Sequence, residues 1–253
     1  MCSTPQISNL KRKPFIQMRP ITSLYSTSRT ELPTHFKSLT FWNDSLHFCN
    51  WVGVKCNPSN ERVEILNLQS QRLVGLIPTS MGNLTSLTGI NLQNNSFNGK
   101  LPQELGSLVR LQDLNFSMNS FSGKILTNLT FCTVLRVVGL SYNELIGPIP
   151  DQIFYLSQLI FLNLGVNNLT GIIPPFIGNF LSLLFLILTR NNLYGTIPQE
   201  LGRLSRLRYI NLYENELSGT IPSSIFNLSS IYFFCHTKSV PRGTPKGYWP
   251  NTS

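Results

Sequence analysis

The chain has few charged side chains and few histidines. Asp, Glu, Lys and Arg make up 12% of its 253 residues, about half of the usual share. Its three histidines, His35, His47 and His236, lie near the two ends, and the glycine-rich loop, HRD and DFG sequences of a kinase are all missing. Nor does the spacing offer a second close ligand pair to complete a four-ligand zinc site with Cys49 and Cys56. We therefore predict a protein that is not an enzyme and uses no metal or other cofactor.

The sequence also lacks a long apolar run and a concentrated basic surface. Its most apolar run, Phe180–Leu188, is too short to span a membrane. Lys and Arg outnumber Asp and Glu 20 to 11, but residues 62–229 carry 10 basic and 8 acidic side chains. Most of the basic excess therefore lies in the flanks, whereas a nucleic-acid binder concentrates it on the folded surface. We expect neither a transmembrane segment nor a nucleic-acid partner.

A strict internal period covers most of the chain. Seven glycines recur at intervals of 24 residues: Gly75, Gly99, Gly123, Gly147, Gly171, Gly195 and Gly219. This period divides residues 62–229 into seven units without an insertion or deletion. One such unit cannot bury its own apolar face, whereas stacked units share a continuous core. The period therefore predicts a solenoid of seven 24-residue repeats.

Each unit places the same kinds of residue at the same positions. Alternating apolar residues such as Ile90 and Leu92 predict a short strand. An asparagine column follows, and its buried amides can satisfy backbone groups where the chain leaves the sheet. Its members are Asn95, Asn119, Asn143, Asn167, Asn191 and Asn215, with Gln71 in the first unit. The glycine then suits a turn with an unusual backbone angle.

The repeated frame LxxLxLxxNxLxGxIPxxLGxL resembles the plant extracellular leucine-rich repeat. The segment FWNDSLHFCNWVGVKC resembles the N-terminal cap of plant leucine-rich repeat receptor kinases. This resemblance implies a right-handed β/α superhelix with a parallel concave sheet and short 3-10 helices or loops on its convex side. It also implies a cap at residues 35–61, preceded by a disordered or degenerate segment at residues 1–34. After the repeats come a partial eighth repeat and an aperiodic tail at residues 230–253.

The cap residues include two tryptophans, Trp42 and Trp51, and the cysteine pair Cys49 and Cys56. A disulfide between these cysteines would close a short loop and contribute roughly 2.5 kcal/mol of stability by chain entropy. Two free thiols, or half of a zinc site, are the alternatives. Cys132 replaces a leucine in an apolar column and is expected to be a small core residue.

The ends of the sequence depart from the family pattern. Residues 1–34 contain no apolar run that could serve as the core of a secretory signal. The paired-cysteine cap that commonly closes such ectodomains is also missing after residue 229. We interpret the chain as the first part of a longer ectodomain without its kinase domain. The resemblance implies an extracellular or plasma-membrane-associated location.

The candidate ligand-binding residues lie in the columns that face outward on the concave sheet. Phe161, Phe185 and Tyr209 occupy one column in successive units, with arginines and further tyrosines nearby. Such an aromatic and basic patch is typical of binding hot spots. The predicted set is Val137, Tyr142, Phe161, Phe185, Arg190, Arg208, Tyr209 and Tyr213. In the alternative, the phenylalanines only stabilise the sheet by packing on neighbouring strands.

N-glycosylation sequons are more frequent than chance predicts, although the repeat itself favours them. They lie at Asn43, Asn83, Asn94, Asn115, Asn128, Asn168, Asn227 and Asn251. Asn94 and Asn115 are expected on the concave face, where a glycan would shield the first units. Ligand binding would then concentrate on units four to seven.

The resemblance implies a non-catalytic module that recognises a peptide or protein, like the ligand-binding ectodomain of a plant leucine-rich repeat receptor-like kinase in defence or development. The expected partners are a peptide or protein ligand on the concave face and a receptor-kinase co-receptor. Two alternatives stay open: a truncated remnant without a ligand, and a soluble protein similar to polygalacturonase inhibitors.

Overall fold

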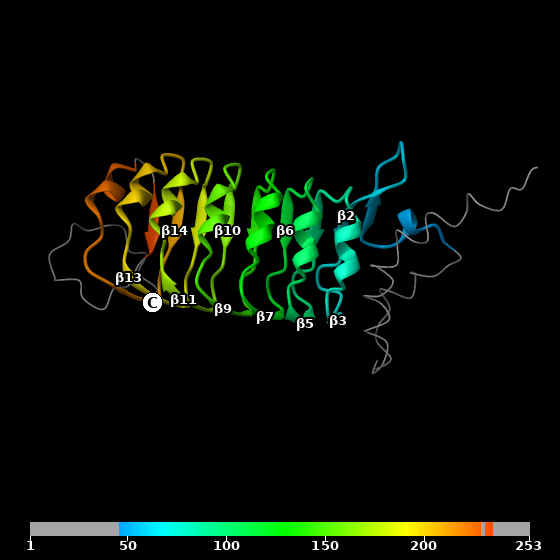
Figure 1. The fold of residues 1–253 in the computed structure, drawn as a ribbon, viewed down its shortest axis with the longest axis horizontal. Coiled ribbons are helices and arrows are strands. Elements are labelled where there is room, and N and C mark those ends of the chain that lie inside the picture. Colours follow the sequence, from blue (N-terminus) through cyan, green and yellow to red (C-terminus); the bar gives the residue numbers. More distant parts are fainter. Residues whose placement is uncertain (1–45, 229–230, 235–253) are drawn as a thin grey trace, which may run out of the picture.

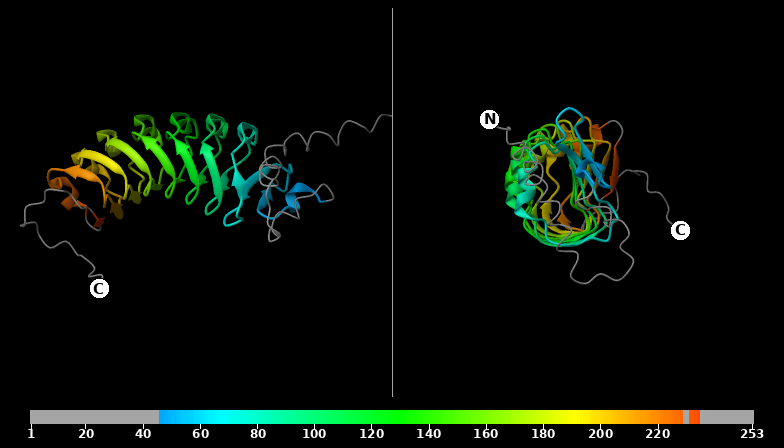
Figure 2. Two further views of the ribbon diagram at one scale, coloured as in Figure 1. Left: turned by 90° about the horizontal axis from the view of Figure 1, so that it is seen from below. Right: turned by 90° about the vertical axis from the view of Figure 1, so that its right-hand side faces the viewer.

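The computed structural model describes residues 46–228 and 231–234, which form an elongated, curved solenoid (Figures 1 and 2). Each repeat contributes one strand to a long sheet, one strand to a second sheet and one 3-10 helix. The repeats follow one another along the axis in chain order, so every repeat contacts mainly its two neighbours. The predicted leucine-rich repeat solenoid is confirmed.

The concave sheet has nine strands in the order β1-β2-β4-β6-β8-β10-β12-β14-β16. β1 pairs antiparallel with β2, and all later neighbours pair in parallel with a register shift of 24 residues, except that Tyr209 pairs with Tyr232. The strands are β1 (Val54–Cys56), β2 (Val63–Asn67), β4 (Gly89–Asn91), β6 (Asp113–Asn115), β8 (Val137–Gly139), β10 (Phe161–Asn163), β12 (Phe185–Ile187), β14 (Tyr209–Asn211) and β16 (Tyr232–Phe234).

A second, seven-stranded parallel sheet follows the concave sheet within each repeat, and the sequence did not predict it. Its order is β15-β13-β11-β9-β7-β5-β3. In six of the seven strands, one buried apolar residue such as Phe97 lies between neighbours that are exposed or half-buried, which anchors an extended segment on the core. The strands are β3 (Val74–Gly75), β5 (Ser96–Lys100), β7 (Ser120–Gly123), β9 (Glu144–Gly147), β11 (Asn168–Ile172), β13 (Asn192–Thr196) and β15 (Glu216–Ser218).

Short 3-10 helices line the convex side, opposite the nine-stranded sheet (Figure 2). A proline such as Pro102 caps most of them at the N-terminus, where a missing backbone N–H costs little. Each helix of the repeats buries one apolar side chain such as Leu105. The helices are η1 (Phe48–Asn50), η2 (Thr79–Asn83), η3 (Gln103–Ser107), η4 (Thr127–Phe131), η5 (Asp151–Tyr155), η6 (Pro175–Asn179), η7 (Gln199–Arg203) and η8 (Ser223–Asn227).

The asparagine column forms an interior ladder, as predicted. Asn167 is buried, and its Nδ2 donates to the carbonyls of Leu140 and Leu164 at 3.0 Å each. Its Oδ1 accepts the backbone N–H of Leu145 at 3.0 Å. The same pattern recurs at the other asparagines of the column. The ladder therefore joins successive repeats where the chain turns away from the sheet.

Backbone angles recur with the same period. The repeated glycines have φ between 74° and 129°, as their unusual turn predicts. A second column with φ between 53° and 60° contains no glycine, and the sequence did not predict it. Its members are Ser70, Asn94, Met118, Tyr142, Val166, Arg190 and Glu214.

The cap is closed by the predicted disulfide between Cys49 and Cys56, whose Cα atoms lie 5.4 Å apart. Phe48 and Trp51 are buried beside it, whereas Trp42 lies outside the described residues. Cys132 is buried in the core, as expected, and desolvation raises the pKa of its thiol to about 11.

Candidate ligand-binding face

Three aromatic residues form a continuous strip on the concave sheet. Phe161, Phe185 and Tyr209 are the first residues of β10, β12 and β14 and pair directly with one another in register. The ring centroids of Phe161 and Phe185 lie 5.9 Å apart, and those of Phe185 and Tyr209 lie 6.5 Å apart. Phe185 exposes 38% of its surface and the other two are half-buried. We call these three residues the aromatic strip.

The remaining predicted residues border this strip. Val137 is half-buried and pairs with Phe161 in the sheet. Tyr142, Arg190 and Tyr213 lie in the turns after their strands and are exposed. Arg208, also exposed, immediately precedes β14. The predicted set therefore consists of the three aromatic residues, Val137 in the same column, and four exposed flanking side chains from other columns.

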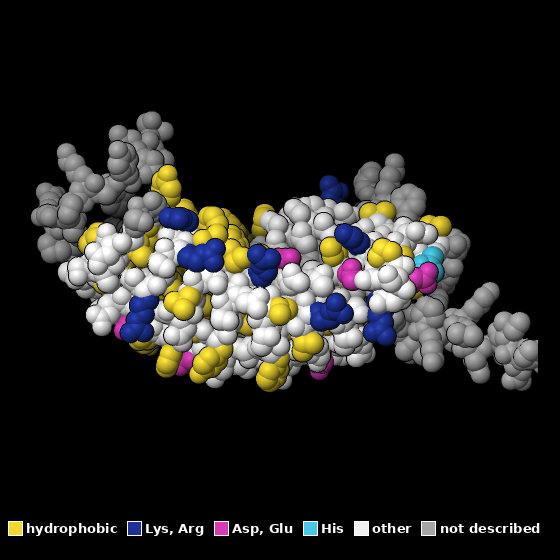
Figure 3. All heavy atoms as spheres, turned by 90° about the horizontal axis from the view of Figure 1, so that it is seen from above, with side chains coloured by type: hydrophobic (Ala, Val, Ile, Leu, Met, Phe, Trp, Pro, Cys, Tyr) yellow, Lys and Arg dark blue, Asp and Glu magenta, His cyan; other side chains and the backbone are white. Residues whose placement is uncertain are grey.

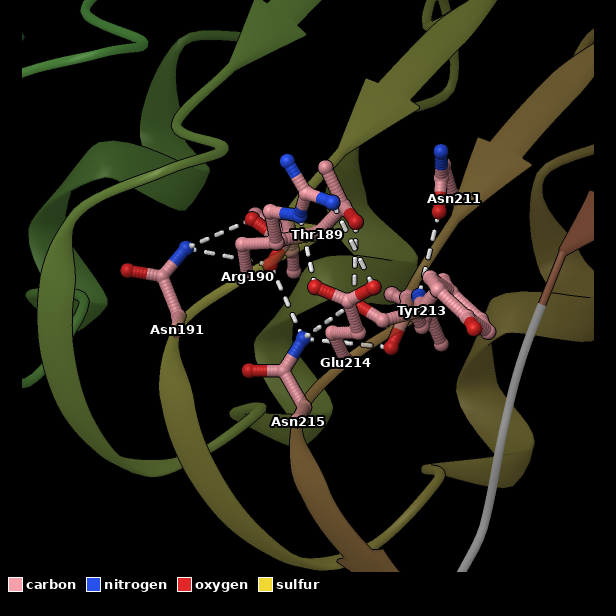
Figure 4. A network of polar contacts seen from close by, with 9 residues as sticks. Thr189, Arg190, Asn191, Asn211, Tyr213, Glu214 and Asn215 are labelled. Atoms are coloured by element: carbon pink, nitrogen blue, oxygen red, sulfur yellow. Dashed lines mark hydrogen bonds and ion pairs between the residues drawn. The ribbon is translucent and has the colours of Figure 1, made fainter.

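Arg190 is held by an acidic neighbour that was not predicted as its partner. Its Nε lies 2.6 Å from Oε2 of Glu214, and its guanidinium donates a second, longer hydrogen bond to Oε1 (Figure 4). The hydrogen bond to Glu214 is the main cause that raises the pKa of Arg190 above its usual value. The two residues occupy one column in adjacent repeats, which was the signal that could have revealed the pair. The positive charge of Arg190 is thus largely offset at the site.

A column of amides on the same face was also missed, although one member, Asn115, was expected on this face as a sequon. Asn67, Asn91, Asn115, Asn163 and Asn211 are the last residues of their strands, two positions after the first aromatic column. Each Oδ1 accepts the backbone N–H of the residue two positions later. Applying the strand period of two to residues 65–69 and their equivalents would have found them.

The concave face therefore divides into two halves along the axis. In the N-terminal half, the Nδ2 groups of Asn91 and Asn115 donate to the Oε1 atoms of Gln69 and Gln93 at 3.0 and 2.9 Å. In the C-terminal half, hydrophobic side chains gather along the concave edge with basic side chains, all of them arginines, beside them (Figure 3). We call the part formed by β2, β4 and β6 the amide half and the part formed by β10, β12 and β14 the aromatic half.

The sequon asparagines lie on several sides of the solenoid. Asn83, Asn94, Asn168 and Asn227 are exposed, whereas Asn115 and Asn128 are half-buried. Asn94 lies in a turn beside the concave sheet, where its Nδ2 donates to Oγ of Ser70 at 2.9 Å. The two remaining sequons, at Asn43 and Asn251, lie outside the described residues.

Metal-binding and membrane-spanning features are absent from residues 46–228 and 231–234. These residues hold no cluster of three or more His, Cys, Asp or Glu side chains that could bind a metal ion. No helix among them has the length and apolar character needed to cross a membrane.

The geometry defines a leucine-rich repeat solenoid, and comparisons with known proteins agree. The Leucine Rich Repeat family model matches residues 86–108, 158–180 and 206–228. The BIR2 ectodomain from Arabidopsis thaliana is 30% identical with a TM-score of 0.60, and the alignment covers 69% of this chain and 92% of that one. The PEPR1–AtPEP1 structure is 33% identical with a TM-score of 0.77, covering 86% of this chain and 31% of that one.

A curated relative, the LRR receptor-like serine/threonine-protein kinase EFR of Arabidopsis thaliana, is 51% identical over 49 residues. That alignment covers 19% of this chain and 5% of the kinase. The chain belongs to the plant leucine-rich repeat family that forms the ectodomains of receptor-like kinases. It matches only a small part of the curated kinase.

Proposed function

We propose that the chain recognises a peptide or protein through the aromatic half of its concave face. The aromatic strip is the observation that carries this proposal. Three adjoining rings on rigid strands offer apolar area to a partner at a low cost in side-chain entropy. Aromatic and arginine side chains are also enriched among the residues that contribute most to binding energy.

The charges beside the strip indicate how a partner would be selected. Arg190 already pairs with Glu214, so a ligand carboxylate would have to compete with an existing ion pair. Arg208 is exposed, and no acidic partner of it is present among the described residues. Binding at this face would therefore depend mainly on apolar contact, with Arg208 as the available positive charge.

Solved structures of related ectodomains support the same kind of partner. Besides the PEPR1–AtPEP1 structure, HAESA has been solved with the peptide hormone IDA and the co-receptor SERK1. That HAESA complex is 27% identical to this chain, with a TM-score of 0.56 and coverage of 87% of this chain and 46% of that one. By analogy, we propose a peptide ligand, a receptor-kinase co-receptor and an extracellular or plasma-membrane-associated location.

A random peptide library tests the proposal, because selection from it requires no identified ligand. Random peptides displayed on phage are selected on the purified full chain alone, and the binding of each enriched peptide is then measured on the full chain and on the Phe161→Ser/Phe185→Ser/Tyr209→Ser variant. We expect the enriched peptides to bind this variant at least about tenfold more weakly, because one lost hot spot alone costs about 2 kcal/mol or more and about 1.4 kcal/mol corresponds to tenfold. Circular dichroism and thermal unfolding establish that the variant is folded.

The amide half supplies a matched control. Asn67→Ser/Gln69→Ser/Asn91→Ser changes three side chains of the same sheet outside the strip, and binding should stay within about twofold of the original. Equal binding to the original chain and the aromatic variant would contradict the proposal. It would favour the alternative in which the aromatic rings only stabilise the sheet.

A further inference from the structure

The tripeptide Asn-Leu-Thr occurs three times, at residues 83–85, 128–130 and 168–170. As acceptors of an N-linked glycan these three segments are identical in sequence, so any difference between them comes from the fold. We infer that Asn83, Asn168 and the exposed Asn227 are open to N-glycosylation in the folded chain, whereas Asn128 is closed to it. This inference rests on the contacts that the side chain of Asn128 makes.

The side chain of Asn128 is enclosed between two successive 3-10 helices. It lies in η4, and its Nδ2 donates a hydrogen bond to the backbone carbonyl of Gln103 in η3. Its Oδ1 is buried and has no hydrogen-bond partner among the described residues. A Cβ atom added to Gly106 would lie 3.0 Å from Cγ of Asn128, so the amide packs directly against the backbone of η3.

The same contact recurs where it has nothing to do with a sequon. In the last repeat, Ser224 occupies the equivalent position in η8 and donates from Oγ to the carbonyl of Gln199 in η7 at 2.8 Å. A Cβ atom on Gly202 would meet Cβ of Ser224 at 2.4 Å. At Asn128 and Ser224 this position of the repeat therefore links consecutive 3-10 helices, and the side chain of Asn128 performs that structural task.

Glycosylation cannot be combined with this contact. The reaction joins Nδ2 to C1 of an oligosaccharide, while the bond between C1 and the pyrophosphate of the lipid-linked donor breaks and an amide proton leaves. The product needs open space around Nδ2. At Asn128 that atom faces the backbone of η3, so a glycan there would separate η4 from η3 and prevent their packing.

The open sites have different surroundings. Asn83 and Asn227 are the last residues of η2 and η8, and Asn168 is the first residue of β11. All three are exposed. None belongs to the nine-stranded sheet, so glycans at these sites would attach outside the concave strands that carry the aromatic strip.

The test measures occupancy site by site in the folded protein. The full chain is secreted from plant cells behind an added signal peptide, and its glycans are removed by a glycosidase in heavy-oxygen water. Mass spectrometry then identifies each asparagine that carried a glycan. We expect the label at Asn83, Asn168 and Asn227, and unmodified Asn128. Label at Asn128 equal to that at Asn83 in protease-resistant, secreted protein would overturn the inference.

Two variants and two peptides complete the experiment. Leu181→Thr creates a sequon at Asn179, the exposed last residue of η6 and the equivalent of Asn83, and should add one glycan. Thr130→Val destroys the Asn128 sequon and should leave the glycan mass unchanged. Synthetic peptides of residues 80–88 and 125–133 should accept glycans equally in microsomes. Poor glycosylation of the 125–133 peptide, or no glycan on Asn179 of the Leu181→Thr variant, would contradict the inference that the fold prevents glycosylation of Asn128.

Discussion

The two halves of the concave face share one backbone but present different chemistry. The first residues of β4 and β6 are Gly89 and Asp113, whereas those of β10 and β12 are Phe161 and Phe185. Strand pairing is parallel and keeps the same register in both halves. The difference therefore lies only in side chains that point away from the core, where the sequence is free to change without altering the coil.

Beneath both halves the interior is nearly constant. The inward strand residues, from Leu66 to Ile210, are buried in every repeat, and the asparagine ladder runs under each of them. The period of 24 therefore records the demands of packing, and we propose that departures from the period on the concave face record recognition. If this is right, matched interior substitutions should cost the same stability in both halves, whereas substitutions on the concave face should have different effects in the two halves.

The largest effect is expected from the interior ladder. Asn119→Leu under the amide half and Asn191→Leu under the aromatic half each remove one acceptor and three donated hydrogen bonds. Buried backbone groups then lose their partners, which costs about 1–3 kcal/mol for each strongly affected group. We expect each variant to lower the free energy of unfolding by about 3–5 kcal/mol in urea titrations.

Asn211→Leu is the matched control for the ladder. This asparagine lies on the concave face and is half-buried; its Oδ1 accepts the backbone N–H of Tyr213 at 3.0 Å, and its Nδ2 donates to Oη of Tyr209 at 3.3 Å. Its loss should cost no more than about 1 kcal/mol because water can replace both bonds. A difference of more than about 2 kcal/mol between Asn119→Leu and Asn191→Leu would show that the two halves differ inside as well.

A smaller effect on the free energy of unfolding, with opposite signs in the two halves, is expected from the column with φ between 53° and 60°. We call it the left-handed column. Asn94 has φ of 57° and Val166 has φ of 56°. Asparagine tolerates this conformation, whereas a β-branched side chain is strained there by about 1–2 kcal/mol. Val166→Asn should therefore raise the unfolding free energy by about 1 kcal/mol, and Asn94→Val should lower it by a similar amount. Thermal unfolding of unglycosylated protein measures both, and shifts of the same sign would contradict the argument.

The left-handed column also shows why part of the fold could not be predicted. The side chains from Ser70 to Glu214 share no type that marks a positive φ. The neighbouring repeat holds this conformation from Ser70 to Arg190, because the backbone N–H groups of these six residues donate to its carbonyls. For Asn94 and Val166 the acceptors are Ser117 and Thr189, at 3.0 and 2.8 Å. Such bonds exist only after the repeats have stacked.

Features that depend on burial were predictable. Leu92, Asn95 and Met81 represent columns in which every repeat has the same demand, so their periodic recurrence identified the coil, the ladder and the apolar interior. The second sheet was missed because six of its strands have only one buried residue each and β3 has none. On the concave face the aromatic column was found by its size and chemistry, whereas the amide column was overlooked because Asn is also a common turn residue.

The smallest predicted effect decides how much the aromatic strip contributes to the sheet itself. A double-mutant cycle with Phe161→Ala and Phe185→Ala measures the interaction free energy of the two rings, whose centroids lie 5.9 Å apart. A tilted aromatic pair on a partly exposed surface should give about 0.5–1 kcal/mol. That value is far below the cost of one ladder asparagine, so stability alone would not account for three adjoining aromatic residues. A coupling above about 2 kcal/mol would reverse this conclusion and make the strip a structural element of the aromatic half.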